Sequence, residues 1–302
     1  MHTGYFEVLQ KNTAILSETN LPEYQYIPQH NKPLPSVQKV KRIVELLRVA
    51  VFPGFYGENI VSTNSLKFHI GVTLEELYAL LTEQILNGLC FSSEESECHE
   101  NEPLASAIAL EFINLIPELK RIIATDVKET YDNDPAAKSY SEVIFSYPTI
   151  RAVFNHRVAH ALLKLDVPVI PRIISELAHS ETGIDIHPGA QIGEYFSIDH
   201  GTGVVIGETA IIGNHVRLYQ GVTLGAKRFT LDEDGFPVNV PRHPIIEDNV
   251  VIYANANVLG RITIGKNSVI GGNVWLTNSI PADSKILQQK AINSAFYDGL
   301  GI

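Results

Sequence analysis

The sequence predicts an α+β protein in which an all-helical N-terminal domain is followed by a parallel β-helix of hexapeptide repeats. Three observations support this prediction: aliphatic residues recur every six positions in the last third of the chain, Gly and Asn residues recur between them, and helical hydrophobic patterns fill the region before them. A spacing of six fits neither the period of about 3.6 residues of a helix nor the period of about two of a strand. It is typical of a solenoid in which each repeat adds one short strand and one turn around a narrow aliphatic core.

The helical domain is assigned to residues 1–183. Its first 35 residues are polar and contain prolines at positions 22, 28, 33 and 35, which predicts an extended arm. A helical pattern of apolar residues begins near Val37, and Thr73 with Glu76 predicts a capping box at the start of the next helix. The helical patterns end near Ser180.

The β-helix is assigned to residues 184–280, and three such repeats close one coil of about eighteen residues. The phased positions are Ile186, Ile192, Ile198 and Val204, then, after a two-residue shift, Ile206, Ile212, Leu218 and Leu224, and finally Ile246, Ile252, Val258, Ile264, Ile270 and Leu276. Residues 226–241 contain an Asp-Glu-Asp-Gly run and two prolines, so they predict a loop that projects from the coils. Residues 281–302 are expected to form a C-terminal tail.

Composition excludes several classes of partner. The 302 residues carry 23 basic and 34 acidic side chains, and the net charge of −11 repels nucleic-acid phosphates and anionic lipids. No apolar run approaches the roughly 20 residues that span a bilayer, and the N-terminus lacks a signal pattern, so a cytoplasmic protein is expected. Cys90 and Cys98 form no Cys-x-x-Cys motif and predict two reduced thiols.

Side chains with catalytic chemistry must stand outside the aliphatic core, on turns or at an edge shared with another chain. The histidines on predicted turns are His200, His215 and His243. A neutral imidazole is suited to removing a proton from a hydroxyl, and a nearby carboxylate fixes its tautomer. Asp185 lies fifteen residues before His200, close to the length of one coil, so the geometry of a β-helix permits an Asp–His contact.

Four sequence blocks carry a resemblance to a known family. They are DIHPGAQIG at 185–193, IDHGTGVVIGETA at 198–210, QGVTLG at 220–225 and RHP at 242–244. In this order and spacing they resemble the serine O-acetyltransferases of the hexapeptide acyltransferase superfamily. The resemblance extends from about Asp134 to Pro281 and implies a left-handed β-helix that transfers an acetyl group from acetyl-CoA to L-serine. The product, O-acetyl-L-serine, belongs to the first step of cysteine biosynthesis.

The resemblance also implies roles for individual residues. His200 matches the general base that takes the proton of the serine hydroxyl, and Asp185 matches the carboxylate that orients it. The substrate-binding residues that it implies are Asp134 and Asp199 for the amino group, Arg242 near the carboxylate, and His243 near the reacting centre. The small residues that match the path of the pantetheine arm are Gly225, Ala226, Ala254 and Gly272. Neither cysteine falls in these blocks, so direct attack in a ternary complex is expected, without a metal ion.

The family further implies feedback inhibition by L-cysteine, a trimer or a dimer of trimers, and binding of the C-terminal Ile302 by O-acetylserine sulfhydrylase. Three alternatives remain open from the sequence. One is a hexapeptide acyltransferase with a homoserine or sugar acceptor, and another is a non-catalytic scaffold. The third is a β-helix carbonic anhydrase that would use His200, His215 and His243 as metal ligands.

Overall fold

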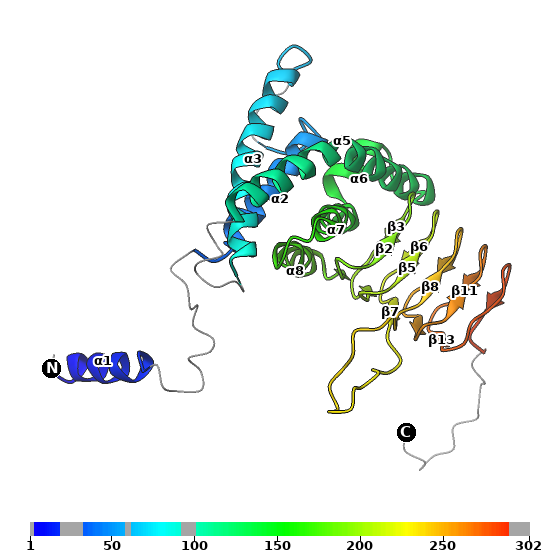
Figure 1. The fold of residues 1–302 in the computed structure, drawn as a ribbon. Coiled ribbons are helices and arrows are strands. Elements are labelled where there is room, and N and C mark those ends of the chain that lie inside the picture. Colours follow the sequence, from blue (N-terminus) through cyan, green and yellow to red (C-terminus); the bar gives the residue numbers. More distant parts are fainter. Residues whose placement is uncertain (1–2, 19–32, 58–61, 92–100, 290–302) are drawn as a thin grey trace.

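The computed structural model describes residues 3–18, 33–57, 62–91 and 101–289, and Figure 1 shows a helical region lying against one end of a β-solenoid. The helices are α1 (Thr3–Leu16), α2 (Val37–Val51), α3 (Leu66–Leu89), α5 (Asn101–Asn133), α6 (Tyr140–Ser146), α7 (Pro148–Lys164) and α8 (Ile170–Thr182). No described helix is long and apolar enough to cross a membrane.

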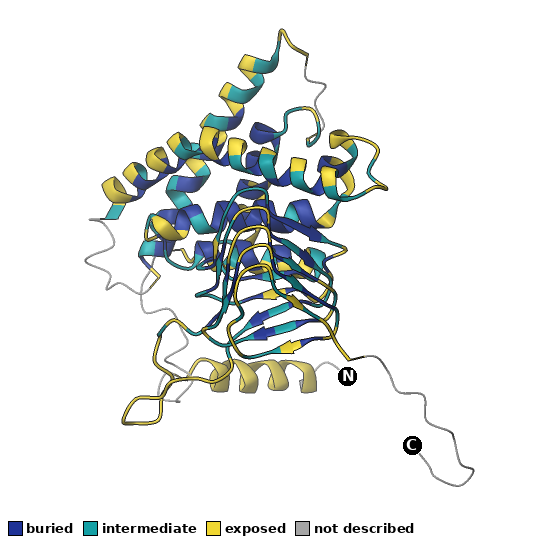
Figure 2. Ribbon diagram, turned by 90° about the vertical axis from the view of Figure 1, so that its right-hand side faces the viewer, coloured by how far each residue is buried: buried dark blue, intermediate teal, exposed yellow. Residues whose placement is uncertain are grey.

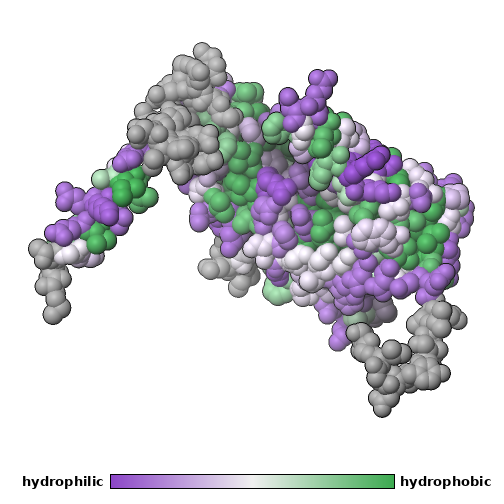
Figure 3. Space-filling view, turned by 90° about the horizontal axis from the view of Figure 1, so that it is seen from below, coloured by the Kyte–Doolittle hydropathy of each residue, from purple (hydrophilic) through white to green (hydrophobic). Residues whose placement is uncertain are grey.

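Helix α1 corrects the expectation of an extended arm over residues 1–35. Residues 3–16 are helical because all four prolines of this segment follow them, whereas residues 19–32 lie outside the described part of the chain. The described side chains of α1 are exposed, including apolar ones such as Tyr5 and Phe6 (Figures 2 and 3).

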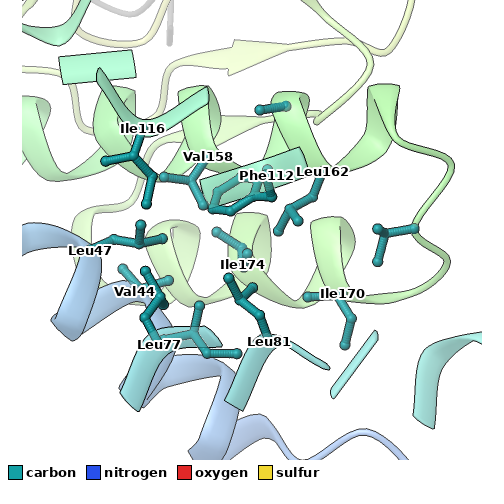
Figure 4. Packing of buried hydrophobic residues seen from close by; sticks show 14 of the residues in the cluster. Val44, Leu47, Leu77, Leu81, Phe112, Ile116, Val158, Leu162, Ile170 and Ile174 are labelled. Carbon is teal, nitrogen blue, oxygen red and sulfur yellow. The ribbon is translucent and has the colours of Figure 1, made fainter. Parts of the chain in front are cut away.

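Helices α2, α3, α5, α7 and α8 share one core. Figure 4 shows apolar side chains from all five converging on one another, among them Leu47, Leu81, Phe112, Leu162 and Ile174. The start of α2 is capped by the Ser36 side chain, which accepts a hydrogen bond from the Lys39 N–H.

The predicted capping box in α3 is wrong. This helix begins at Leu66 and not at Thr73, because no residue between Ser65 and Thr73 interrupts it. Thr73 lies inside the helix, where its hydroxyl donates to the His69 carbonyl. Cys90, at the end of the same helix, is disulfide-bonded rather than a free thiol. Sequence spacing carries no signal for such a bond, because pairing depends on the distance between Cβ atoms in the fold.

The solenoid consists of three parallel sheets, which form the three faces of a left-handed β-helix (Figure 1). Face one contains β1 (Asp185–Ile186), β4 (Val205–Ile206), β7 (Thr223–Gly225), β10 (Asn257–Leu259) and β13 (Trp275–Leu276). Face two contains β2 (Gln191–Ile192), β5 (Ile211–Ile212), β8 (Ile245–Ile246) and β11 (Thr263–Ile264). Face three contains β3 (Ser197–Asp199), β6 (Arg217–Tyr219), β9 (Val251–Ile252), β12 (Val269–Ile270) and β14 (Lys285–Ile286).

The aliphatic residues at the six-residue spacing lie in or against the core of this solenoid, which confirms the repeat pattern. The solenoid continues past the expected boundary at residue 280, because Ile286 also packs against the core and β14 pairs with β12. Ile286 lies opposite Ile270, sixteen residues before it, so this short last coil breaks the six-residue spacing on which the boundary depended.

Two departures from the eighteen-residue coil determine where polar side chains gather. Asp185 lies opposite Val205, so the first coil has two extra residues, and these fall in the turn that contains His200. Thr223 lies opposite Asn257, and the long insertion of this coil is the loop at 226–241, which projects from the solenoid in Figure 1. Arg242 and His243 follow that loop directly.

A buried ion pair joins the helices to the first coil. Asp126 in α5 accepts two hydrogen bonds of 3.0 Å from the Arg157 guanidinium in α7 and a third of 3.0 Å from the Phe196 N–H. Arg157 also donates to the carbonyls of Ile192 and Gly193. Because Phe196 immediately precedes β3, this pair fixes the strand that ends at Asp199 against the helix that leads to Asp134.

Candidate active site

The first polar cluster lies at the edge where face three turns into face one, here called the His200 edge. An open pocket of about 410 Å³ at this edge is lined by Asp134, Ser146, Tyr147, Pro148, Thr149, Asp199 and His200. Three side chains that the sequence predicted as site residues therefore meet in one pocket: Asp134, Asp199 and His200.

Asp134 is held as a carboxylate by donors from its own region. One oxygen accepts the Tyr147 hydroxyl at 2.6 Å and the other accepts the Ala136 N–H at 2.8 Å. These hydrogen bonds lower the pKa of Asp134, and the bond from Tyr147 has the larger effect. The same bond to Asp134 raises the pKa of Tyr147 to about 12. Sequence reasoning missed Tyr147, because its role depends on a contact made across thirteen residues of chain.

His200 stands in the turn created by the two extra residues of the first coil. Its φ of 59° lies in the left-handed region, and the next residue, Gly201, has φ of 88°. A Cβ on Gly201 would lie 2.5 Å from Ile184 Cδ1 and 2.9 Å from Thr149 Cγ2, so only glycine allows this turn to approach helix α7. The turn thereby brings His200 beside the residues that follow α6.

The imidazole of His200 is 71% exposed and makes no hydrogen bond to a described residue. Its Nε2 lies 3.8 Å from an Asp199 carboxylate oxygen, which is an ion-pair distance rather than a hydrogen bond. No hydrogen bond or ion pair joins His200 to Asp185 among the described residues, so the role of Asp185 as the orienting carboxylate stays a prediction. Asp185 lies on face one, opposite Val205.

The second polar cluster lies at the edge where face one turns into face two, here called the His243 edge. Arg242 donates to a Glu208 carboxylate oxygen at 2.6 Å and to Asn239 at 3.0 Å. His243 contacts Thr209, with 2.9 Å between Nδ1 and the Thr209 hydroxyl oxygen. Burial, followed by the neighbouring Arg242 charge, lowers the pKa of His243 to about 4.

The two clusters do not meet within one chain. The His200 turn leads into strands of face one, whereas Arg242 and His243 lead into β8 of face two, so the width of face one separates them. His215 lies at the third edge, where it stacks on Tyr195 and its Nδ1 lies 3.1 Å from Glu129. Among the described residues, no group of three or more His, Cys, Asp or Glu side chains is arranged to hold a metal ion.

The small residues expected along the coenzyme have a second reason to be small. A Cβ on Gly225 would lie 2.9 Å from Leu259 Cδ2, and one on Gly272 would lie 3.1 Å from the Ala254 carbonyl oxygen. Stacking of neighbouring coils therefore already limits the space for a side chain at both positions. Ala226, however, leads directly into Lys227 and Arg228, which are exposed cations at the His243 edge.

Comparison with known proteins agrees with the motifs. Residues 243–278 match the family described as "Bacterial transferase hexapeptide (six repeats)". A serine acetyltransferase of Synechococcus elongatus is 49% identical over 276 residues, which cover 89% of this chain and 86% of that protein.

Two solved structures show the same relationship. Serine acetyltransferase isoform 3 of Entamoeba histolytica, solved with cysteine, matches with a TM-score of 0.69 at 34% identity over 89% of this chain and 87% of that one. The soybean enzyme, solved with serine, matches with a TM-score of 0.54 at 27% identity over 85% of this chain and 98% of that one. With this sequence identity over nearly its whole length and this fold, the chain belongs to the serine acetyltransferase family.

Proposed function

We propose that this chain transfers the acetyl group of acetyl-CoA to the hydroxyl of L-serine, with His200 as the general base. The observation that supports this proposal most directly is the meeting of Asp134, Asp199 and His200 in one pocket, from a helix end and from the first coil. Two carboxylates beside one imidazole fit an acceptor that carries an ammonium group next to a hydroxyl.

In the proposed reaction the ammonium group of serine binds Asp134 and Asp199, which leaves its hydroxyl near His200. His200 removes the hydroxyl proton as the oxygen attacks the thioester carbonyl, and a tetrahedral intermediate forms. The intermediate then releases the CoA thiolate, which takes the proton back from the imidazolium. Since His200 has no hydrogen bond to a described residue, its ring is free to turn, and we assign its orientation to Asp185 or Asp199 in the substrate complex.

The coenzyme is proposed to extend along the solenoid past Gly225, Ala226, Ala254 and Gly272, with Lys227 and Arg228 placed for its phosphates. Arg242 is proposed to bind the serine carboxylate, a task suited to a guanidinium fork. His243 is proposed to lie beside the reacting centre.

A thiol-release assay tests the proposed acceptor. With acetyl-CoA, release of CoA is expected with L-serine and not with homoserine or an amino sugar, and adding a chelator is expected to leave the rate unchanged. Release that prefers either alternative acceptor would reject serine as the substrate. A rate that falls with chelation and returns with zinc would favour metal chemistry.

The positions of the two clusters support a site shared between chains. Around a threefold axis, with face one of each chain turned inward, the His200 edge of one chain meets the His243 edge of the next. We therefore propose a trimer, or a dimer of trimers, in which Asp134, Asp199 and His200 come from one chain and Arg242 and His243 from its neighbour.

Mixed trimers test this assembly. Inactive His200→Ala and His243→Ala chains, refolded together in equal amounts, are expected to regain about a quarter of the wild-type activity, because one site in three is intact in the three quarters of trimers that are mixed. The same two proteins mixed without refolding are the control. Mixed trimers that stay inactive would place each site within one chain.

L-cysteine resembles serine with a thiol in place of the hydroxyl, and we propose that it inhibits by occupying the same pocket. The cytoplasm is the proposed location.

Ile302, outside the described residues, is proposed to enter the active site of O-acetylserine sulfhydrylase, since a terminal carboxylate with an apolar side chain resembles an amino-acid ligand. Titrating that enzyme with the full chain and with a form lacking Ile302 tests the contact; equal affinities would disprove it.

A further inference from the structure

The GETA segment of the second coil is not used by the reaction described above, yet it surrounds His243. Gly207, Glu208 and Thr209 form the turn of that coil at the His243 edge, directly beside the Arg242-His243 pair. Glu208 pairs with Arg242, whereas Gly207 and Thr209 both lie against His243.

The hydrogen bonds of the Thr209 side chain all join it to Arg242 and His243. Its hydroxyl oxygen accepts the backbone N–H of Arg242 at 2.9 Å and that of His243 at 3.1 Å. Because both acceptor positions of the oxygen are used, its own proton is left to donate to His243 Nδ1, 2.9 Å away. One side chain therefore binds the backbone and the ring of the same residue.

The backbone of Thr209 identifies the tautomer. Its N–H donates to His243 Nδ1 at 3.1 Å, so Nδ1 carries a lone pair and the proton of the neutral ring is on Nε2. Arg261 holds the two turns together, since it donates to the carbonyl of Thr209 at 2.7 Å and to that of His243 at 3.0 Å.

Gly207 provides the space for the ring. A Cβ at this position would lie 2.0 Å from both Cδ2 and Nε2 of His243, a distance that no packing can accommodate. The backbone of Gly207 does not have a positive φ, so the need for glycine here comes from the imidazole and not from the turn.

We propose that Thr209 and Gly207 are positioning residues that hold His243 as a neutral imidazole with its proton on Nε2. This inference rests on the proposed place of His243 beside the reacting centre. Held in this way, His243 cannot act as a second base. It acts as a hydrogen-bond donor, toward the substrate carboxylate or toward the oxygen that becomes negative in the tetrahedral intermediate.

The charged and titratable groups around the ring are consistent with this state. Arg242, Arg261 and His187 lower the pKa of His243, Glu208 raises it, and burial has the largest effect, since the residue is 7% exposed. The ring is therefore neutral at neutral pH.

Matched variants separate positioning from a general structural role. Thr209→Val keeps the shape and the backbone N–H but removes the hydroxyl, Thr209→Ser restores the hydroxyl, and Gly207→Ala keeps the hydroxyl but takes the space of the ring. In Thr209→Val the backbone N–H groups of Arg242 and His243 lose their acceptor. This variant is therefore expected to lower kcat/KM for serine by about 10- to 100-fold, with KM for acetyl-CoA unchanged. Thr209→Ser is expected within about threefold of wild type, and Gly207→Ala close to Thr209→Val.

The second readout does not depend on activity. Nitrogen-15 spectra of labelled histidine, with the His243 signal assigned from its loss in His243→Ala, are expected to show the proton on Nε2 in wild type and in Thr209→Ser. In Thr209→Val the backbone N–H of residue 209 still donates to Nδ1 but the hydroxyl donor is lost, so a shifted Nδ1 signal and a titration closer to the usual histidine range are expected. The fully buried His156 provides a signal for correct folding in the same spectra.

A Thr209→Val spectrum identical to wild type would overturn the inference, as would a wild-type proton on Nδ1. Wild-type activity and an unchanged spectrum in Gly207→Ala would overturn the assignment of that glycine. If His243→Ala instead keeps full activity while Thr209→Val alters the spectrum, the proposed role of His243 in the reaction fails and the positioning stands.

Discussion

Replacement of His200 by alanine is expected to lower the turnover number by roughly 10²- to 10⁴-fold, the usual contribution of a general base. The fold is expected to stay intact, because the side chain is 71% exposed and makes no hydrogen bond to a described residue. The measurement is steady-state release of CoA with saturating serine and acetyl-CoA, alongside thermal unfolding of the same preparation.

His215→Ala is the matched control. It removes another exposed turn histidine with a left-handed backbone, at the edge that carries neither cluster, so near-normal turnover is expected. A folded His200→Ala protein that turns over at the wild-type rate would remove His200 from the mechanism. An equal loss in both variants would point to a general effect on the solenoid.

The structure also bears on which carboxylate assists His200. Asp199→Asn and Asp185→Asn can be compared directly, since both replacements keep the shape of the side chain. In the free enzyme only Asp199 lies within ion-pair distance, at 3.8 Å, while the family resemblance names Asp185. Because Asp199 is also proposed to bind the serine ammonium group, both variants are compared at saturating serine. The variant with the larger fall in turnover under that condition identifies the carboxylate that orients the imidazole in the substrate complex.

The solenoid was predictable from sequence because its signal is local and repeated. One inward side chain every six residues, as at Ile252, Val258 and Ile264, is sufficient to specify a strand and the face to which it belongs. Neighbouring coils repeat the same pattern. The pattern failed where coil length changes. Ile286 falls out of phase, because the last coil has sixteen residues instead of eighteen.

The supporting residues of the site could not be found in this way. Tyr147 reaches Asp134 across thirteen residues, and Thr209 reaches His243 across 34, through an inserted loop. Each contact depends on which turns lie side by side in three dimensions, and no periodic pattern encodes that. The motif blocks drew attention to the segment that holds Thr209, but only the hydrogen bonds show what it does.

The same limit applies to the ion pair between the domains. Asp126 lies in a helical pattern that reads as an ordinary amphipathic helix, and Arg157 lies in another. Nothing in their spacing indicates that they meet. Their burial, 1% exposed for Asp126 and 8% for Arg157, is a consequence of packing α5 and α7 against the first coil.

Replacement of Asp126 by asparagine is accordingly expected to destabilise the protein by about 3–5 kcal/mol, because it leaves the Arg157 charge buried without its counter-ion. Burial by itself raises the pKa of the Asp126 carboxyl, and the Arg157 guanidinium and Phe196 N–H act in the opposite direction to keep it charged.

Urea unfolding at one fixed protein concentration measures the difference in stability between Asp126→Asn and wild type, since assembly would otherwise change the midpoint. Glu176→Gln, which breaks the exposed Arg172–Glu176 pair, is the control and is expected to cost less than about 1 kcal/mol. Equal midpoints for the two variants would show that Asp126 does not hold the domains together. If Asp126 does hold them, its loss is also expected to raise KM for serine, because the Phe196 N–H that it binds begins the strand that ends at Asp199.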